Sequence, residues 1–240
     1  MDLKHSPENG FQQTSCAEYL RGWYAAPQGR RVLETVLREI GDHRALRYGD
    51  ALLEIAPVRL VDEEKVGPAW TLRVGSEAAA LRADPLRLPL PAESIACVLL
   101  AHACTDPSGA GPLIAEAARV LAPEGCLLLL ESGACAASGR HARGSALPPG
   151  MRRGVYRRWL EQAGLSVRGQ SVLSVLPARL PSSWHRALGR ADALAAPWFP
   201  MLGSCVLTIA QRRDLMPLST RSRWRALRVP VRASGSSQWA

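Results

Sequence analysis

Apolar residues follow two different spacings along the chain. Short segments that are almost entirely apolar are typical of strands that a parallel sheet buries on both faces; they lie at 51–56, 94–101 and 126–131. Further strand candidates lie at 70–74, 166–175 and 203–212. Apolar residues recur every three or four positions, which predicts helices, in a segment ending near residue 24 and at 28–40, 111–121, 151–163 and 182–198. This alternation predicts an α/β fold, a doubly wound, mostly parallel sheet with helices on both faces.

The length and the charge distribution predict one domain with two extensions. A chain of 240 residues is long enough for one α/β domain with a full core. We expect a mobile N-terminal segment over 1–15, a domain over 16–212 and a basic tail over 213–240. Residues 211–240 hold seven arginines against one acidic residue, so they carry +6 of the net charge of +9. Such a tail is expected to contact a polyanion or a protein, or to be a solvated extension.

Several classes of protein lack their signature in this sequence. No run approaches about 18 apolar residues and the first residues contain no apolar leader, so we expect a cytoplasmic protein without a membrane segment. The six cysteines show no C-x-x-C spacing, and Cys97, Cys126 and Cys205 lie in apolar runs, which predicts buried free thiols. The motifs of serine hydrolases, P-loop proteins and zincins are absent.

The stretch 84–131 is similar to the core of the type 11 class I S-adenosylmethionine-dependent methyltransferases. It has an acid before a Pro-rich loop (DPLRLPLP), a buried strand (CVLLAHAC), a helix (LIAEAARVL) and the turn APEG before a second strand. The flanks WYAAPQGR and QRRDLMPL resemble the opening and closing segments of one bacterial branch of that family. The resemblance implies a Rossmann-like methyltransferase fold, S-adenosylmethionine as the methyl donor, and transfer to an unidentified acceptor.

In that family the loop after the first strand has an acidic residue followed by glycines, which let the backbone approach the cofactor. The aligned segment here is EIAPVR, residues 54–59. Glu54 keeps the acidic position, whereas Ala56 and Val58 replace the first two glycines and Pro57 removes a backbone donor. We predict cofactor contacts for Glu54 and Ala56, in a loop that takes another shape or binds the cofactor poorly. Alternatively, this segment is only a strand end and a turn.

The resemblance implies three further site positions. Glu77, after the second strand, is a candidate for holding the ribose hydroxyls, or it begins a helix. Asp84 is the candidate acceptor for the adenine amino group, with Pro85 or Leu86 packing on the ring, or it opens a turn. His102 follows a buried strand where a parallel sheet opens to ligands. It is the candidate general base and a cofactor contact, or a histidine at a strand end whose hydrogen bonds are made within the protein.

Two functions remain open at this point. The first is a methyltransferase that uses S-adenosylmethionine, because methyl transfer demands alignment of the acceptor more than particular side chains. The second is a methyltransferase-fold module that binds or regulates without catalysis, which the replaced glycines favour.

Overall fold

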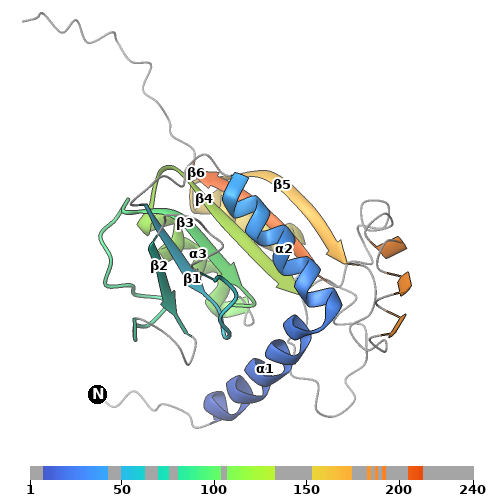
Figure 1. Ribbon diagram of the computed structural model, residues 1–240. Coiled ribbons are helices and arrows are strands. Elements are labelled where there is room, and N and C mark those ends of the chain that lie inside the picture. The colour runs from blue at the N-terminus through green and yellow to red at the C-terminus, as the bar shows by residue number, and fades with distance from the viewer. Residues whose placement is uncertain are drawn as a thin grey trace, which may run out of the picture.

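The structure, a computed structural model, describes part of the chain. The described residues are 8–42, 50–62, 70–75, 81–103, 107–132, 153–174, 183–184, 187–188, 191–192 and 205–212. Its elements are α1 (Glu8–Ala25), α2 (Pro27–Asp42), β1 (Ala51–Ile55), β2 (Trp70–Val74), β3 (Ile95–Ala101), α3 (Pro107–Val120), β4 (Leu121–Ser132), α5 (Arg153–Gln162), β5 (Leu165–Ser174) and β6 (Cys205–Arg212). Figure 1 shows their arrangement.

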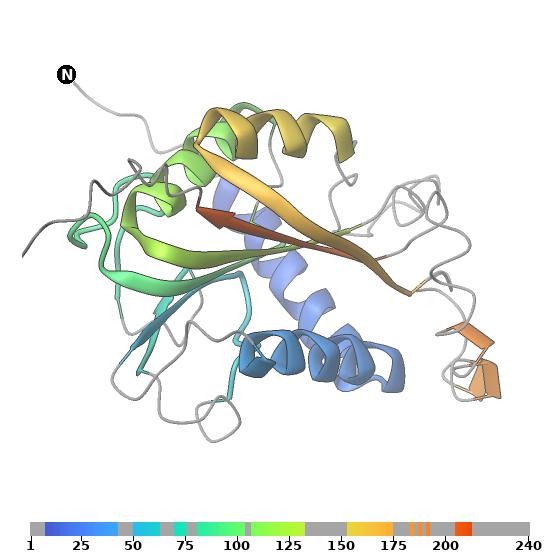
Figure 2. The ribbon, with the colours of Figure 1, turned by 90° about the horizontal axis from the view of Figure 1, so that it is seen from above.

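The strands form one six-stranded sheet in the order β2-β1-β3-β4-β6-β5. Strands β1 to β4 pair in parallel, and β6 runs antiparallel to both of its neighbours. Helices α1 and α2 lie on one side of the sheet, and α3 and α5 lie on the other (Figure 2). The prediction of a doubly wound, mostly parallel sheet with helices on both faces is therefore confirmed.

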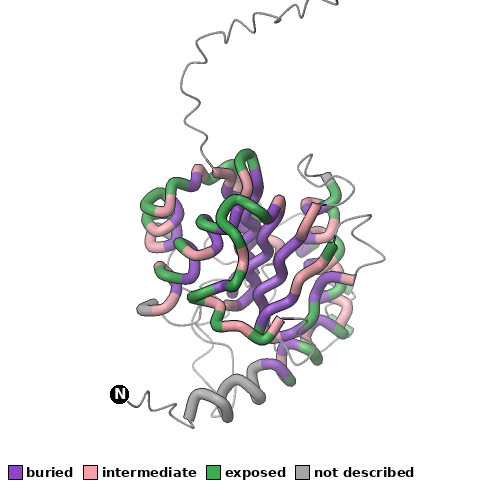
Figure 3. Tube along the Cα trace, turned by 90° about the vertical axis from the view of Figure 1, so that its left-hand side faces the viewer, coloured by how far each residue is buried: buried purple, intermediate pink, exposed green. Residues whose placement is uncertain are grey.

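The predicted apolar runs form the core. The middle of the sheet is buried, whereas the connecting loops and the outer helix faces are exposed (Figure 3). In β3, six of the seven residues are buried, which explains why its sequence contains almost only apolar residues. Cys97, Cys126 and Cys205 are buried and are not part of a disulfide, as predicted. Cys97 and Cys126 pair across β3 and β4, with their sulfur atoms 3.8 Å apart.

Several boundaries differ from the sequence prediction. Helix α1 begins at Glu8, so residues 8–15, which we assigned to a mobile segment, are helical. This part of the chain contains no proline, so the helix can continue towards the N-terminus from the turns that pack on the sheet. Of the helix expected over 182–198, short helical pieces at 183–184, 187–188 and 191–192 are described. The basic tail over 213–240 lies outside the described residues. In the described part of the chain, no helix is long and apolar enough to cross a membrane.

The turn between α1 and α2 is unusually close, and a glycine allows it. The two helices are separated by one residue, and the backbone N–H of Arg30 donates to the carbonyl of Ala26 over 3.0 Å. A Cβ atom on Gly29 would lie against the Trp23 carbonyl oxygen and 2.5 Å from Tyr24 Cα. Gly29 thus lets the first turn of α2 pack directly on the end of α1, which fixes where Trp23 and Tyr24 point.

Candidate functional site

The strand order marks one edge of the sheet as the candidate site. The chain passes from β1 to β2 on one side and then returns to form β3 on the other side of β1. In open α/β sheets, ligands bind beyond the carboxyl ends of the strands at such a reversal of strand order. Helix α1 crosses beneath these strand ends (Figure 1). The region between α1 and the carboxyl ends of β1 and β3 is therefore the candidate site.

Glu54, at the end of β1, is enclosed by its own loop. Its Oε1 accepts hydrogen bonds from the backbone N–H groups of Leu60 and Val61, at 2.6 and 3.2 Å. Its Oε2 pairs with Arg73 Nε on β2 at 3.2 Å, and the side chains are 2% and 8% exposed. Burial raises the pKa of Glu54, while the two backbone donors and Arg73 oppose that shift. The carboxylate thus joins the loop to β1 and β2, and both of its oxygens already have protein partners.

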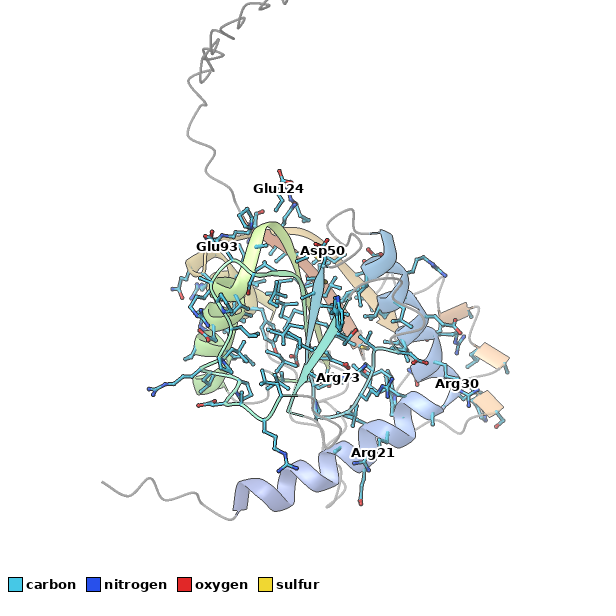
Figure 4. All side chains as sticks on the ribbon, turned by 60° about the vertical axis from the view of Figure 1, so that its left-hand side comes forward. Arg21, Arg30, Asp50, Arg73, Glu93 and Glu124 are labelled. Atoms are coloured by element: carbon cyan, nitrogen blue, oxygen red, sulfur yellow. The ribbon has the colours of Figure 1, made fainter. Side chains whose placement is uncertain are left out.

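Arg73 is the residue of this network that sequence reasoning missed. Its Nη2 donates to the Val61 carbonyl over 3.1 Å, in addition to the ion pair with Glu54. Figure 4 shows Arg73 near the carboxyl ends of the strands, whereas Asp50, Glu93 and Glu124 lie at the opposite edge. A charged residue inside a short strand was the available signal, because a buried arginine needs an acidic partner nearby.

The loop that replaces the glycines takes a different shape. Among the described residues other than glycine, positive φ occurs at Glu93, His102 and Glu124, so Val58 does not adopt the left-handed backbone that a glycine allows and a β-branched residue disfavours. Ala56 and Val58 are 3% and 4% exposed and pack in the hydrophobic cluster that includes residues of α1 and α2. Over 56–62 no helix follows β1. The loop fills space with apolar side chains, and the predicted cofactor contact of Ala56 remains a prediction.

His102 lies in this region, in an unusual conformation. It follows β3 with φ 51°, a left-handed backbone that only a few per cent of non-glycine residues adopt, with histidine enriched among them. Its backbone N–H donates to the Leu130 carbonyl over 2.8 Å, and its Nε2 lies 2.7 Å from the Tyr24 hydroxyl. Its Nδ1 is buried, and no described residue supplies a hydrogen-bond partner for it. The side chain is thus held by α1, and Nδ1 has no hydrogen-bond partner among the described residues.

Trp23 and Tyr24 bring α1 into the site. Their ring centroids are 4.8 Å apart at an interplanar angle of 85°. Burial raises the pKa of Tyr24 well above its ordinary value, and the nearby acidic groups Cys205, Glu131 and Glu54 add to that shift. The Tyr24 hydroxyl therefore keeps its proton. The indole Nε1 of Trp23 is a second buried polar atom for which no described residue is a partner. Both residues belong to the segment WYAAPQGR, which resembles the opening segment of the family but gave no prediction of a site residue.

The burial of His102 predicts a specific pH dependence of stability. Burial lowers the pKa of His102 from 6.5 to about 4. The unfolded chain therefore binds a proton that the folded chain does not, and stability is lost as the pH falls below 6.5. We expect this residue alone to cost about 2 kcal/mol between about pH 7.5 and pH 5. Urea unfolding of the wild type and of His102→Gln at both pH values measures the difference. Equal losses in the two proteins would contradict this assignment.

Asp84 and Leu86 lie on an exposed turn. Asp84 Oδ1 accepts the backbone N–H of Leu86 over 2.9 Å, and the Arg87 N–H donates to the Asp84 carbonyl. No described residue makes a hydrogen bond to Oδ2, and Leu86 is 43% exposed. The turn thus presents a carboxylate oxygen beside an apolar side chain, the pair predicted for an adenine ring. Glu77, predicted for the ribose, lies outside the described residues.

Several solved structures with a fold similar to that of this chain are methyltransferases. A geranyl diphosphate methyltransferase in complex with GPP and sinefungin is 16% identical with a TM-score of 0.54, over 75% of this chain and 78% of that one. The geranyl diphosphate C-methyltransferase of Streptomyces coelicolor A3(2), with Mg²⁺, geranyl diphosphate and S-adenosyl-L-homocysteine, is 16% identical with a TM-score of 0.52, over 75% and 77%. A candidate methyltransferase of Bacillus halodurans C-125 is 14% identical with a TM-score of 0.50, over 74% and 97%. No family model and no curated protein matches the sequence. At these identities the likeness establishes the fold.

Proposed function

Since the chain has the fold of the class I S-adenosylmethionine-dependent methyltransferases, we propose that it transfers a methyl group from S-adenosylmethionine to an acceptor held between α1 and the carboxyl edge of the sheet. The observation that carries this proposal is His102. It lies at the point where the strand order reverses, in a left-handed backbone, with a buried Nδ1 that no described residue satisfies. Strained backbone and unpaired buried polar atoms concentrate at functional sites.

Two sets of residues would hold the two ends of an S-adenosyl group. At the adenine end, Asp84 Oδ2 would accept from the exocyclic amino group, with Leu86 against the ring. At the methionine end, the indole N–H of Trp23 is a donor only, which suits a carboxylate oxygen. The ring nitrogen Nδ1 of His102 is the second polar atom available there. These contacts would replace those of the missing glycine loop.

When bound, S-adenosylmethionine supplies an already activated methyl group on a sulfonium, so the protein needs mainly to align the acceptor and exclude water. Helix α1 crosses beneath the strand ends (Figure 1) and would help to exclude water from a bound ligand. Tyr24 is a positioning residue for His102. If its hydroxyl donates to Nε2, then Nδ1 carries a proton and donates to a ligand. If Nε2 carries the proton and donates to the Tyr24 oxygen, then Nδ1 accepts.

A second function is favoured by the loop after β1. Both oxygens of Glu54 are engaged within the protein, and Ala56 and Val58 occupy the positions of glycines with buried side chains. These are features of a fold kept for its stability. The second candidate is therefore a non-catalytic methyltransferase-fold module, with the arginine-rich tail as its contact to a polyanion or a protein.

Calorimetric titration with S-adenosylhomocysteine separates the two functions. We expect micromolar binding by the full chain and a loss of about tenfold or more for Asp84→Ala, because a hydrogen bond to a charged group contributes about 1.5–3 kcal/mol. The matched control is Glu161→Ala, which removes an exposed acid of α5 whose ion pair with Arg157 is a surface contact. Its affinity should be unchanged. Absence of heat at millimolar ligand would contradict the enzyme and favour the non-catalytic module.

A further inference from the structure

An ion pair on α3 holds the loop that leads from β2 to β3. Glu116 and Arg119 lie one turn apart on α3, and two nitrogen atoms of Arg119 donate to the two carboxylate oxygens of Glu116, each over 2.8 Å. Glu116 Oε1 also accepts the backbone N–H of Leu88 over 2.7 Å. Arg119 donates to the carbonyl oxygens of Leu88 and Leu90 over 3.1 and 3.0 Å. The pair therefore binds three backbone groups of the loop.

These contacts exceed those of an ordinary ion pair on a helix surface. Such a pair contributes little to stability, since solvent screens it and both side chains lose freedom. Arg119 uses four of its five N–H donors at once, two on the carboxylate and two on the loop. Its planar guanidinium fixes the direction of each bond. The loop segment 84–91 also contains three prolines, which restrict its backbone further.

The part of the loop that this pair fixes is the turn that carries Asp84. The Arg87 N–H closes the turn by donating to the Asp84 carbonyl, and Leu88 follows directly. Leu88 is buried and packs in the hydrophobic cluster that includes residues of α3. Before the turn, the Leu81 N–H donates to the carbonyl of Arg73 on β2. Asp84 therefore lies between two points at which the loop is attached to the domain.

We propose that Glu116 and Arg119 are positioning residues that hold the Asp84 carboxylate in place for the 6-amino group of a purine, and that they thereby set the selectivity of the site for an adenine ring. This inference rests on the proposed binding of S-adenosylmethionine. A hydrogen bond discriminates between ligands when its acceptor is held in the productive geometry, because a mobile acceptor turns to water when the ligand lacks the donor. Both residues act through the loop backbone.

The test compares two ligands that differ in one group. S-adenosylhomocysteine and its 6-deamino analogue, in which hydrogen replaces the amino group of adenine, are each titrated calorimetrically into the full chain. We expect the wild type to bind S-adenosylhomocysteine about tenfold tighter, since the amino group donates to a charged acceptor. Arg119→Met and Glu116→Ala should each reduce this preference to about threefold or less, while the affinity for the analogue changes by less than about twofold.

Two further variants separate positioning from a general loss of structure. Glu116→Gln should keep most of the preference, because its amide oxygen still accepts from the N–H of Leu88 and from Arg119. Arg157→Met breaks an exposed ion pair with Glu161 on α5 and should leave the preference unchanged. Without ligand, the amide hydrogen of Leu88 should exchange faster in Glu116→Ala than in the wild type, since it loses its acceptor.

The outcomes assign each failure to one claim. A preference that survives both Arg119→Met and Glu116→Ala overturns the positioning role and leaves the proposed methyl transfer standing. Equal losses of affinity for the two ligands also overturn it, because a pair that only stabilises the fold affects both alike. If the wild type binds the two ligands equally, the roles of Asp84 and of the pair are both wrong, while cofactor binding stands. If S-adenosylhomocysteine does not bind, the proposed function and this inference fail together.

Discussion

Replacing Arg73 by methionine is expected to lower the free energy of unfolding by about 3–5 kcal/mol, the cost of leaving one partner of a buried ion pair alone. Methionine keeps most of the length of the side chain, so the loss comes from the charge and the hydrogen bonds. The carboxylate of Glu54 stays buried at the end of β1 without its cation. In a chain of this size the melting temperature should fall by roughly 6–20 °C. Urea unfolding at neutral pH measures the change.

The loss of stability in Arg73→Met should depend on pH. Burial already raises the pKa of Glu54 in the folded protein, and loss of Arg73 removes an opposing interaction, so the pKa rises further. A carboxyl group whose folded pKa is raised binds its proton more tightly when folded, so stability increases as the pH falls through that value. The deficit should be smaller at about pH 5 than at about pH 8. The double variant Glu54→Gln/Arg73→Met should recover part of the loss, because the amide oxygen still accepts from the loop. If the free energy of unfolding of Arg73→Met lies within about 1 kcal/mol of the wild-type value, this account is contradicted.

Gly29→Ala is expected to be the second most damaging change. The new Cβ would meet the backbone of Trp23 and Tyr24, which cannot move aside as a flexible side chain can. Overpacking of this kind costs about 1–3 kcal/mol, and relief requires α1 to shift away from α2. That shift would also move the Tyr24 hydroxyl from His102. The two readouts are urea unfolding and the titration of His102 by NMR, whose pKa should rise towards its ordinary value as water enters.

Gly22→Ala is the matched control for this substitution. Gly22 is exposed on the same helix, and its added Cβ would have no neighbour within 4 Å. Alanine should stabilise the helix there by about 0.5–1 kcal/mol. A Gly29→Ala protein as stable as the wild type, with an unchanged His102 titration, would show that the close turn does not position Tyr24.

The fold was predictable because its signals are local and repeated. The buried runs of β1, β3 and β4 have no polar face, and only a sheet covered on both sides satisfies such runs. The early start of α1 was not predictable, since the polar segment before Cys16 shows no apolar stripe. The sequence can mark a strand end, but it cannot show which distant side chains meet there.

Only part of the site was predictable, because the sequence does not show which distant side chains meet at a strand end. His102 was found because a polar residue after a buried strand falls at the open edge of a parallel sheet. Its partner Tyr24 lies 78 positions earlier, and no spacing rule connects them. For Val58, the replaced glycine indicated that the loop could take another shape, but the sequence did not show which shape it takes. The pairing of Glu54 with Arg73 depends on the register of β1 and β2, which places them directly opposite each other.

A crystal structure of the full chain with S-adenosylhomocysteine tests the central claim most directly. That claim is that the region between α1 and the carboxyl ends of β1 and β3 holds the cofactor without a glycine loop. The expected result is density for the ligand in that region, with a polar atom within hydrogen-bond distance of His102 Nδ1 and the adenine amino group at Asp84. A crystal grown with saturating ligand in which protein side chains fill that region, or in which the ligand binds elsewhere, would contradict it.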